Sequence, residues 1–429
     1  MPRFFVQNFG CRATQADGAA LAAQLTERGL ECASDRHAAD FVILNTCTVT
    51  SSADDDVRQT VRRVHRENPA SRILVTGCYA QRAPEELAAL PGVEWVVGNS
   101  HKTGIADLLT GAPYHSQILV GDIFASRDFL TAPVMEAAAD RARPNLKIQD
   151  GCNNRCSFCI IPFVRGRSRS SPADFVVEQV RNLAVRYREV VLTGINLGRW
   201  GKEPGSNLRL AGLIRRLLRE TEIDRIRLSS VEPMDFSDDL LDLMAASPRV
   251  AKHVHAPLQS GSDGVLRRMH RKYRPRHYAD RILKARSLMP DAAIGADVMA
   301  GFPGETDAEF EENRAFIECL PFTYLHVFTY SERPGTAAAE MRHPVPIHVR
   351  RERSRSLREL AAEKNLEFRR RMTGRKLSVV TLEEPRTALS SNYLKVEMVA
   401  ARPSNQLLEV EIAGLTYAGL QEAAPFSVF

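Results

Sequence analysis

The sequence predicts an α/β protein with three successive parts: a doubly wound parallel sheet, a partial (β/α)6 barrel and a small all-β barrel. Three observations predict this order. Short apolar runs alternate with helical patterns up to about residue 110, and the alternation resumes near residue 144 for six repeats. After a long helical stretch, the chain ends in three runs of alternating apolar and polar residues, a pattern typical of strands.

The first part spans residues 1–110. Its apolar runs predict strands at residues 4–6, 41–44, 73–75 and 95–97. Because a helical pattern separates each strand from the next, these strands should form βαβ units and lie parallel in one sheet. The periodic pattern is lost over residues 111–143, where alanine-rich and mixed-charge stretches indicate a connecting segment.

The second part, residues 144–371, should form the partial barrel and end in a basic helix. Its six strand candidates cover residues 146–148, 190–192, 226–228, 253–255, 294–298 and 324–328. The third part, residues 372–429, has strand candidates at residues 377–382, 393–399 and 407–412. We expect this tail to be a small β domain of its own.

Composition limits the class of protein. The 429 residues are 44% apolar with a net charge of +6, which suits globular domains and permits a polyanionic partner. The N-terminus lacks the apolar core of a secretory signal, and no apolar run approaches the about 18 residues of a membrane span. We therefore expect a cytoplasmic protein without membrane contact. In that compartment, eight cysteines favour metal ligands or catalytic thiols over disulfides.

Three cysteines lie close together directly after the first barrel strand. Cys152, Cys156 and Cys159 are separated by three and then two residues, so one loop can place their thiolates around one face of an iron–sulfur cubane. Such clusters usually take four cysteines, and three would leave one iron open for another ligand. A zinc site is the alternative, but zinc prefers four protein ligands, and no fourth cysteine or nearby histidine completes the set.

Three other cysteines share a local context although they are far apart in the sequence. Cys11, Cys47 and Cys78 each follow one of the first three strands. The carboxyl ends of parallel strands lie at one edge of a sheet, so these thiols should converge and form a second three-thiolate cluster site. Three unrelated buried thiols are the alternative. Cys32 and Cys319 have apolar neighbours and no clustered partner, and we interpret them as packing residues.

These six clustered cysteines give the chain a resemblance to a known family. The loop motif on a six-repeat barrel resembles the radical S-adenosylmethionine superfamily, and the three upstream cysteines resemble those of its methylthiotransferases. The resemblance covers nearly the whole chain and includes a tail similar to the TRAM RNA-binding module. Thr14 is a departure, because the family usually has asparagine there. The stretches that resemble the branch acting on N6-threonylcarbamoyladenosine in tRNA are residues 45–50, 75–81, 148–154, 227–233 and 391–394.

The resemblance implies the cofactors and the site. It implies S-adenosylmethionine and two [4Fe–4S] clusters, with the loop motif of Cys152, Cys156 and Cys159 holding the catalytic one. Replacing an unactivated aromatic C–H by C–S offers no acidic proton and no leaving group, so the cofactor must supply the difficult step. Barrel active sites form where strands end. Candidate contacts to S-adenosylmethionine there are Thr193, Asn196, Ser229, Glu232, Gln259 and Asp297, each with a purely structural role as the alternative.

The resemblance also implies the substrate and partners. We expect methylthiolation of C2 of N6-threonylcarbamoyladenosine next to the tRNA anticodon, with the anticodon loop and an electron donor protein as partners. The sulfur donor is not identified. The alternatives are methylthiolation of N6-isopentenyladenosine in tRNA or of a ribosomal protein side chain, and a non-catalytic iron–sulfur RNA-binding protein.

Basic segments indicate where RNA would bind. Residues 350–371 contain nine Lys or Arg and four Glu, which predicts a phosphate-facing surface; a solvated helix with internal ion pairs is the alternative. Further basic residues lie at positions 267–276. A third set, Arg165, Arg167 and Arg169, follows the cysteine loop and lies closest to the predicted chemistry.

Overall fold

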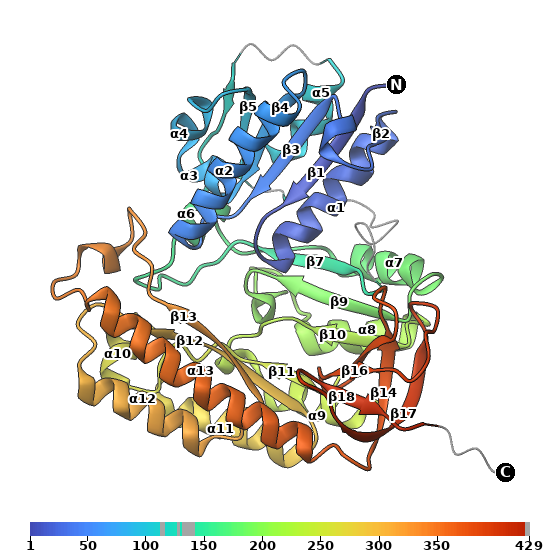
Figure 1. Ribbon diagram of the computed structural model, residues 1–429, viewed down its shortest axis with the longest axis vertical. Coiled ribbons are helices and arrows are strands. Elements are labelled where there is room, and N and C mark those ends of the chain that lie inside the picture. Colours follow the sequence, from blue (N-terminus) through green and yellow to red (C-terminus); the bar gives the residue numbers. More distant parts are fainter. Residues whose placement is uncertain (112–115, 127–128, 131–141, 425–429) are drawn as a thin grey trace.

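The computed structural model describes residues 1–111, 116–126, 129–130 and 142–424. The N-terminal part forms one parallel sheet in the order β2-β1-β3-β4-β5-β6 (Figure 1). Its strands are β1 (Arg3–Asn8), β2 (Glu31–Cys32), β3 (Phe41–Thr46), β4 (Arg72–Gly77), β5 (Val93–Gly98) and β6 (Ile118–Leu119). The four strands predicted for this part are confirmed.

Helices cover both faces of this sheet because successive strand residues point to opposite faces. Phe41 and Ile43 of β3 belong to the core on one face, and Val42 and Leu44 to the core on the other. The first core includes α1 (Arg12–Glu27) and α5 (Ile105–Leu109), and the second includes α2 (Ser51–Glu67), α3 (Cys78–Arg82) and α4 (Pro84–Ala88). The doubly wound arrangement predicted from the sequence is confirmed.

The expected connecting segment, residues 111–143, contributes to this sheet. Its short strand β6 pairs with Val96 and Val97 of β5, and Leu130 is buried in the core beside α1. The sheet therefore continues beyond residue 110. The sequence did not predict β6 because a strand of two residues is too short to show a periodic pattern. Residues 112–115, 127–128 and 131–141 of the segment lie outside the described residues.

The second part contains the six strands that the sequence predicts. They are β7 (Asn145–Asp150), β9 (Glu189–Gly194), β10 (Arg225–Leu228), β11 (His253–His255), β12 (Ala293–Ala300) and β13 (Tyr324–Thr329). Parallel pairing joins β10-β9-β7 and β11-β12-β13, and one parallel bridge joins Ile226 of β10 to Val250, which lies just before β11. The short β8 (Arg169–Ser170) pairs antiparallel with β7.

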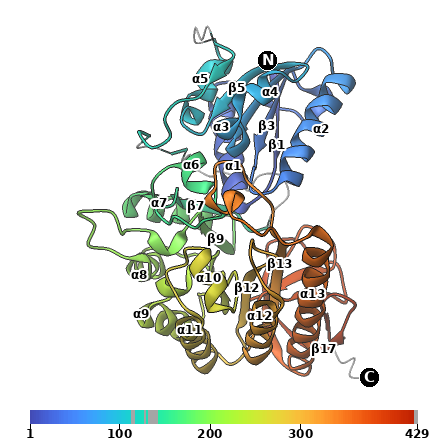
Figure 2. The ribbon, with the colours of Figure 1, turned by 90° about the vertical axis from the view of Figure 1, so that its left-hand side faces the viewer.

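Helices lie on the outside of these strands (Figure 2). They are α7 (Ala173–Ala184), α8 (Leu210–Glu220), α9 (Asp238–Ala246), α10 (Asp263–Arg268), α11 (Pro275–Leu288), α12 (Asp307–Cys319) and α13 (Ile347–Arg370). The short α6 (Ile161–Arg165) packs instead against α3 of the N-terminal part. Buried residues of α7, α8, α9 and α11 share one core with the strands. In the described part of the chain, no helix is both long and apolar enough to cross a membrane.

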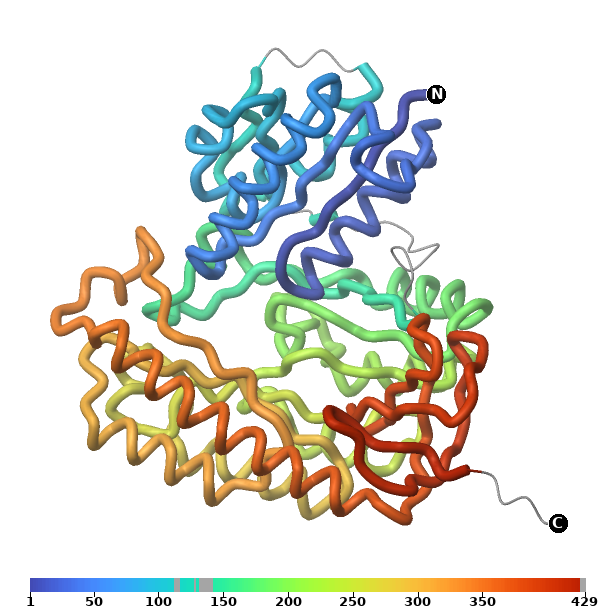
Figure 3. Tube along the Cα trace, viewed as in Figure 1, coloured from blue at the N-terminus to red at the C-terminus, as the bar shows by residue number. Residues whose placement is uncertain are grey.

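The tail folds into a closed barrel, as predicted. Its strand order is β14-β15-β16-β18-β17, from β14 (Lys376–Thr381), β15 (Thr387–Ser390), β16 (Lys395–Glu397), β17 (Leu407–Leu415) and β18 (Leu420–Glu422). The barrel packs against the second part, beside β10 and β11 (Figure 3). Arg227 of β10 donates to the Ser390 and Ser391 carbonyls, each at 3.0 Å, so buried polar contacts join the two parts.

A buried cluster of one carboxylate and three arginines lies next to this junction. Glu189 accepts from Arg227 at 2.7 Å and from Arg225 at 3.2 Å, and Arg143 lies at 3.3 Å. Burial alone would raise the pKa of Glu189, but the charge and hydrogen bonds of Arg227 and the charges of Arg143 and Arg225 lower it to about 2. Glu189 is therefore ionised and balances the buried cations Arg225 and Arg227.

Several cations of the basic segment 350–371 are used inside the protein. Arg350 and Arg369 are buried and donate to backbone carbonyls, and buried Arg353 pairs with Glu305 and Asp307. The hypothesis that the whole segment faces phosphate is therefore wrong for these three residues. The exposed cations of α13 include Arg351, Arg355 and Arg370.

Candidate active site

The turns that carry Cys11, Cys47 and Cys78 meet at the carboxyl edge of the N-terminal sheet. Cys11 precedes α1, Cys47 follows β3 and Cys78 begins α3. Gly10 and Gly77 have left-handed backbones, with φ of 95° and 102°, and a Cβ on Gly10 would lie only 2.8 Å from the Cys47 sulfur. The three thiols converge, as the parallel strand order predicts.

Cys47 and Cys78 are buried whereas Cys11 is exposed, and sulfur atoms of this triad receive polar contacts. Burial, followed by the nearby thiols of Cys78 and Cys11, raises the pKa of Cys47 to about 12. The Thr14 hydroxyl lies 3.5 Å from the Cys11 sulfur, so the departure seen in the sequence keeps a polar contact. Two N–H groups point at the Cys78 sulfur: Arg165 Nε at 3.3 Å and Asn99 Nδ2 at 3.7 Å.

The loop after β7 gathers the second triad. The Cys159 N–H donates to the Cys156 carbonyl at 3.1 Å and tightens the loop. Burial, followed by the nearby thiol of Cys156, raises the pKa of Cys159 to about 12. Asn196 Nδ2 lies 3.6 Å from the Cys152 sulfur, and Arg271 Nη1 lies 3.2 Å from the Cys156 sulfur. Two of the three sulfur atoms therefore receive N–H donors from outside the loop.

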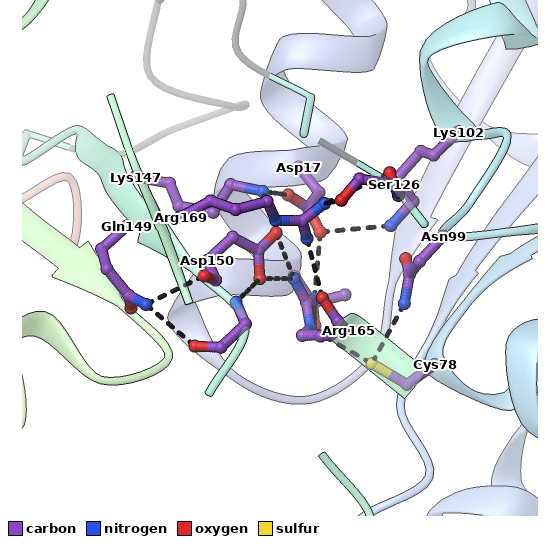
Figure 4. Close-up of polar contacts among 12 residues, drawn as sticks. Asp17, Cys78, Asn99, Lys102, Ser126, Lys147, Gln149, Asp150, Arg165 and Arg169 are labelled. Carbon is purple, nitrogen blue, oxygen red and sulfur yellow. Dashed lines mark hydrogen bonds and ion pairs between the residues drawn. The ribbon is translucent and has the colours of Figure 1, made fainter. Parts of the chain in front are cut away.

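A buried charge network joins the two cysteine sites (Figure 4). Asp17 of α1 accepts from Lys102 at 3.1 Å and from Arg165 at 3.0 Å, and it also pairs with Lys147. Both oxygens of Asp150, just before the cysteine loop, accept from Arg165 at 2.9 and 3.0 Å. Burial would raise the pKa of Asp17, but the charges of Lys102, Lys147 and Arg165 hold it at about 2.

Arg165 is therefore not part of an RNA-facing basic set. It is 1% exposed and contacts both aspartates and the Cys78 sulfur, so the prediction that grouped it with Arg167 and Arg169 is wrong for this residue. Sequence reasoning also missed Lys147 and Asp150 as part of the site. The sequence could have indicated both residues, because each is a charged residue in the buried strand β7.

The other two cysteines do not contribute to packing. Cys32 and Cys319 are both exposed, so the interpretation of these thiols as packing residues is wrong. Cys32 lies in the edge strand β2, and Cys319 is the last residue of α12. Their apolar neighbours face the interior, and the cysteines themselves do not.

A cavity of about 310 Å³ lies between the Cys11 turn and the ends of the barrel strands. Three residues predicted to contact S-adenosylmethionine line it: Thr193, Ser229 and Asp297. Asp297 accepts from His255 Nε2 at 3.2 Å and from His326 Nδ1 at 3.1 Å. Burial would raise the pKa of Asp297, but these two histidines lower it well below its usual range.

The other three candidates lie near the cysteine loop or next to Asp297 of the cavity. Asn196 contacts the Cys152 sulfur, and Glu232 pairs with Arg271, which contacts the Cys156 sulfur. The Gln259 N–H donates to the Asp297 carbonyl at 2.8 Å. The structure thus brings all six candidates to the strand ends that face the cysteines. Their contact with S-adenosylmethionine stays a prediction.

Comparison with known proteins identifies the family. Residues 3–98 match the model described as "Uncharacterized protein family UPF0004", and residues 146–317 match the Radical SAM superfamily. Threonylcarbamoyladenosine tRNA methylthiotransferase MtaB of Aquifex aeolicus is 36% identical over 95% of this chain and 99% of its own. The chain belongs to the radical S-adenosylmethionine methylthiotransferase family.

Other comparisons agree with this membership. The protein of the same name from Bacillus subtilis is 38% identical over 90% of this chain and 88% of its own. The tRNA-2-methylthio-N(6)-dimethylallyladenosine synthase of Novosphingobium aromaticivorans is 33% identical over 88% and 86%. Among solved structures, the radical S-adenosylmethionine methyltransferase TsrM from Kitasatospora setae shares the fold, with a TM-score of 0.58 and 15% identity over 79% of this chain and 77% of its own.

A radical S-adenosylmethionine methylthiotransferase uses S-adenosylmethionine and two [4Fe–4S] clusters. The two cysteine triads fit such clusters. Among the described residues, His255, Asp297 and His326 bring three possible metal-binding atoms within 4.8 Å of one another, and neither cysteine triad does so. Neither triad is therefore spaced for one zinc ion, whose sulfur ligands lie about 2.3 Å from the metal. Wider spacing and N–H donors at the sulfur atoms suit a cluster of several irons.

Proposed function

We propose that this enzyme adds a methylthio group to C2 of N6-threonylcarbamoyladenosine in tRNA, next to the anticodon. The observation that carries the proposal is the cavity that reaches from Cys11 to the ends of β9 and β10. Relatives named for this substrate match nearly the full chain at 36% and 38% identity, which supports it. The synthases named for dimethylallyladenosine, at 33% and 34%, represent the second candidate substrate.

In this proposal, Cys152, Cys156 and Cys159 hold one cluster and Cys11, Cys47 and Cys78 hold the other. When bound, the clusters and S-adenosylmethionine supply the radical and sulfur chemistry that acid and base groups cannot provide. The protein orients and tunes them. Asn196 and Arg271 donate to sulfur atoms of the first triad, and Asn99 and Arg165 to a sulfur atom of the second.

The cavity is proposed to receive a single flipped base. Anticodon loops present unpaired bases that proteins can extrude into a pocket, whereas a duplex hides the C2–H of adenine. The exposed part of α13 and the tail barrel would bind the surrounding phosphates, in the cytoplasm where tRNA is found. The enzyme also needs an electron donor protein and a source of sulfur.

Loss of the gene is expected to remove the methylthio group from threonylcarbamoyladenosine in cellular tRNA. Mass spectrometry of tRNA nucleosides from a deletion strain measures this, with the isopentenyl nucleoside of the same strain as internal control. If only the isopentenyl nucleoside loses its methylthio group, the substrate is wrong while the chemistry holds. If neither nucleoside changes, the proposal of a tRNA substrate fails.

Changing Arg351 and Arg355 together to glutamine is expected to weaken tRNA binding. Both side chains are exposed on α13, and each phosphate that the variant no longer binds should lower the slope of log affinity against log salt by about one. Binding of fluorescent tRNA at several salt concentrations measures the slope. Arg215→Gln, which removes an exposed arginine paired with Asp239, is the control. An unchanged slope in the double variant would exclude this face of α13 from the RNA interface.

A further inference from the structure

One wall of the cavity beside Cys11 carries an arginine with an unpaired hydrogen-bond donor. Arg12, the first residue of α1, lines the cavity and donates through Nη2 to the Tyr393 hydroxyl at 3.1 Å. Its Nη1 is buried, and no group in the described structure accepts a hydrogen bond from it. A guanidinium offers its donors as a fork that suits a carboxylate. This wall is therefore suited to bind an anionic oxygen.

The adjoining wall is aromatic and also has an unpaired polar atom. His253 is 3% exposed and its Nε2 lies 2.6 Å from the Tyr324 hydroxyl, whereas its Nδ1 has no partner among the described residues. The His253 ring stacks on Tyr393 with centroids 4.3 Å apart. Tyr393 has a left-handed backbone with φ of 64°, a conformation that a bulky residue rarely adopts and that its surroundings must enforce.

The charge at this end of the cavity is positive. Burial, and then the positive charge of Arg227, lowers the pKa of His253 well below its usual value, and Arg12 and Arg143 contribute in the same direction. The Asp297 carboxylate of the cavity is already bonded to two histidines. An incoming anion would therefore meet Arg12 together with a neutral, hydrogen-bonding His253.

The position of Arg12 next to Cys11 also places it near the expected N6 substituent of the adenine base. In adenine, one ring nitrogen, N1, separates C2 from C6, so a substituent on the C6 amino group lies beside the reacting C2–H. Arg12 directly follows Cys11, a proposed ligand of the second cluster. A base whose C2 approaches this cluster would bring its N6 substituent close to Arg12.

We propose that Arg12, with Tyr393 and His253, binds the carboxylate of the threonylcarbamoyl group and so selects this nucleoside over one with an apolar N6 group. The inference rests on the function proposed above. A threonylcarbamoyl group carries a carboxylate, a hydroxyl and a urea, whereas an isopentenyl group has no polar atom and would leave Arg12 Nη1 buried and unpaired. A site built to bond a polar group strongly rejects an analogue that lacks it.

The test uses the full-length enzyme with both clusters and three anticodon stem–loops, which carry threonylcarbamoyladenosine, its methyl ester or isopentenyladenosine. For Arg12→Gln, the Kd of the acid RNA is expected to rise about tenfold or more, with little change for the ester, because only the acid offers a charged acceptor. Arg12→Lys should restore part of this affinity. Arg28→Gln, an exposed arginine that ends the same helix, is the matched control and should bind like the wild type.

Two readouts separate this role from damage to the neighbouring Cys11 site. Iron content and cleavage of S-adenosylmethionine without RNA should be the same in Arg12→Gln as in the wild type. Equal loss of affinity for acid and ester, or no loss for either, would overturn the assignment of Arg12. A wild-type enzyme that binds and methylthiolates the isopentenyl RNA better than the threonylcarbamoyl RNA would instead overturn the proposed function.

Discussion

Changing Cys152, Cys156 and Cys159 together to alanine is expected to remove about half of the iron and to abolish cleavage of S-adenosylmethionine. The reason is that this loop supplies every thiol of its site, whereas the other triad belongs to three turns of a different sheet. The second cluster should therefore survive the change. Iron and sulfide assays after anaerobic reconstitution, together with measurement of 5′-deoxyadenosine, test this expectation.

The complementary variants sharpen the result. Changing Cys11, Cys47 and Cys78 to alanine should also halve the iron, but it should leave cleavage of S-adenosylmethionine measurable while methylthiolation is lost. Changing the exposed Cys32 and Cys319 to alanine is the control and should preserve all iron. Complete loss of iron from a folded protein with only one triad changed would contradict two separate cluster sites.

Glu189→Gln is expected to destabilise the protein by about 3 to 5 kcal/mol, the usual consequence of leaving buried charges without their partner. Arg225 and Arg227 are 2% and 0% exposed, and both bond to this carboxylate. A neutral amide keeps the shape and removes the balancing charge. Chemical denaturation of wild type and variant gives the difference in free energy of unfolding, provided that both unfold reversibly.

The pH dependence gives this prediction a second test. The pKa of Glu189 in the folded protein, about 2, is below its ordinary value of 4.5, so its stabilising contribution is present above about pH 4.5 and is lost as the pH falls towards 2. The wild-type advantage over Glu189→Gln should shrink over that window. Glu220→Gln removes a partly exposed surface carboxylate that also pairs with arginine, and it should leave the unfolding midpoint nearly unchanged. Equal effects of the two changes would contradict the role assigned to burial.

The strands and the meeting of Cys11, Cys47 and Cys78 could be predicted because their cause is local. An apolar run marks each strand, and parallel order then brings the three following turns to the same edge. The contact between Asp17 and Lys147 could not be predicted in this way. These residues are 130 positions apart, Asp17 in helix α1 and Lys147 in strand β7, so no periodic pattern relates them.

The same limit applies to the cavity. Arg12 and Tyr393 are 381 positions apart, and they meet only because the tail barrel packs against the second part of the chain. Taken alone, Arg12 is an ordinary polar residue at a helix start, and Tyr393 is an ordinary aromatic in a turn. Their relation is set by the packing of three parts of the chain, and the sequence provides no local sign of it.

The charge network of Asp17, Lys102, Lys147, Asp150 and Arg165 restricts how this architecture can be recombined. Asp17 and Lys102 come from the N-terminal part of the chain, and the other three members from the second part. A hybrid that joined this N-terminal part to a barrel without these partners would bury Asp17 with an incomplete set of cations, at a cost of several kcal/mol. The two parts are therefore expected to be inherited as a matched pair, and domain exchange between distant relatives should succeed only when the donor brings both sides of the network.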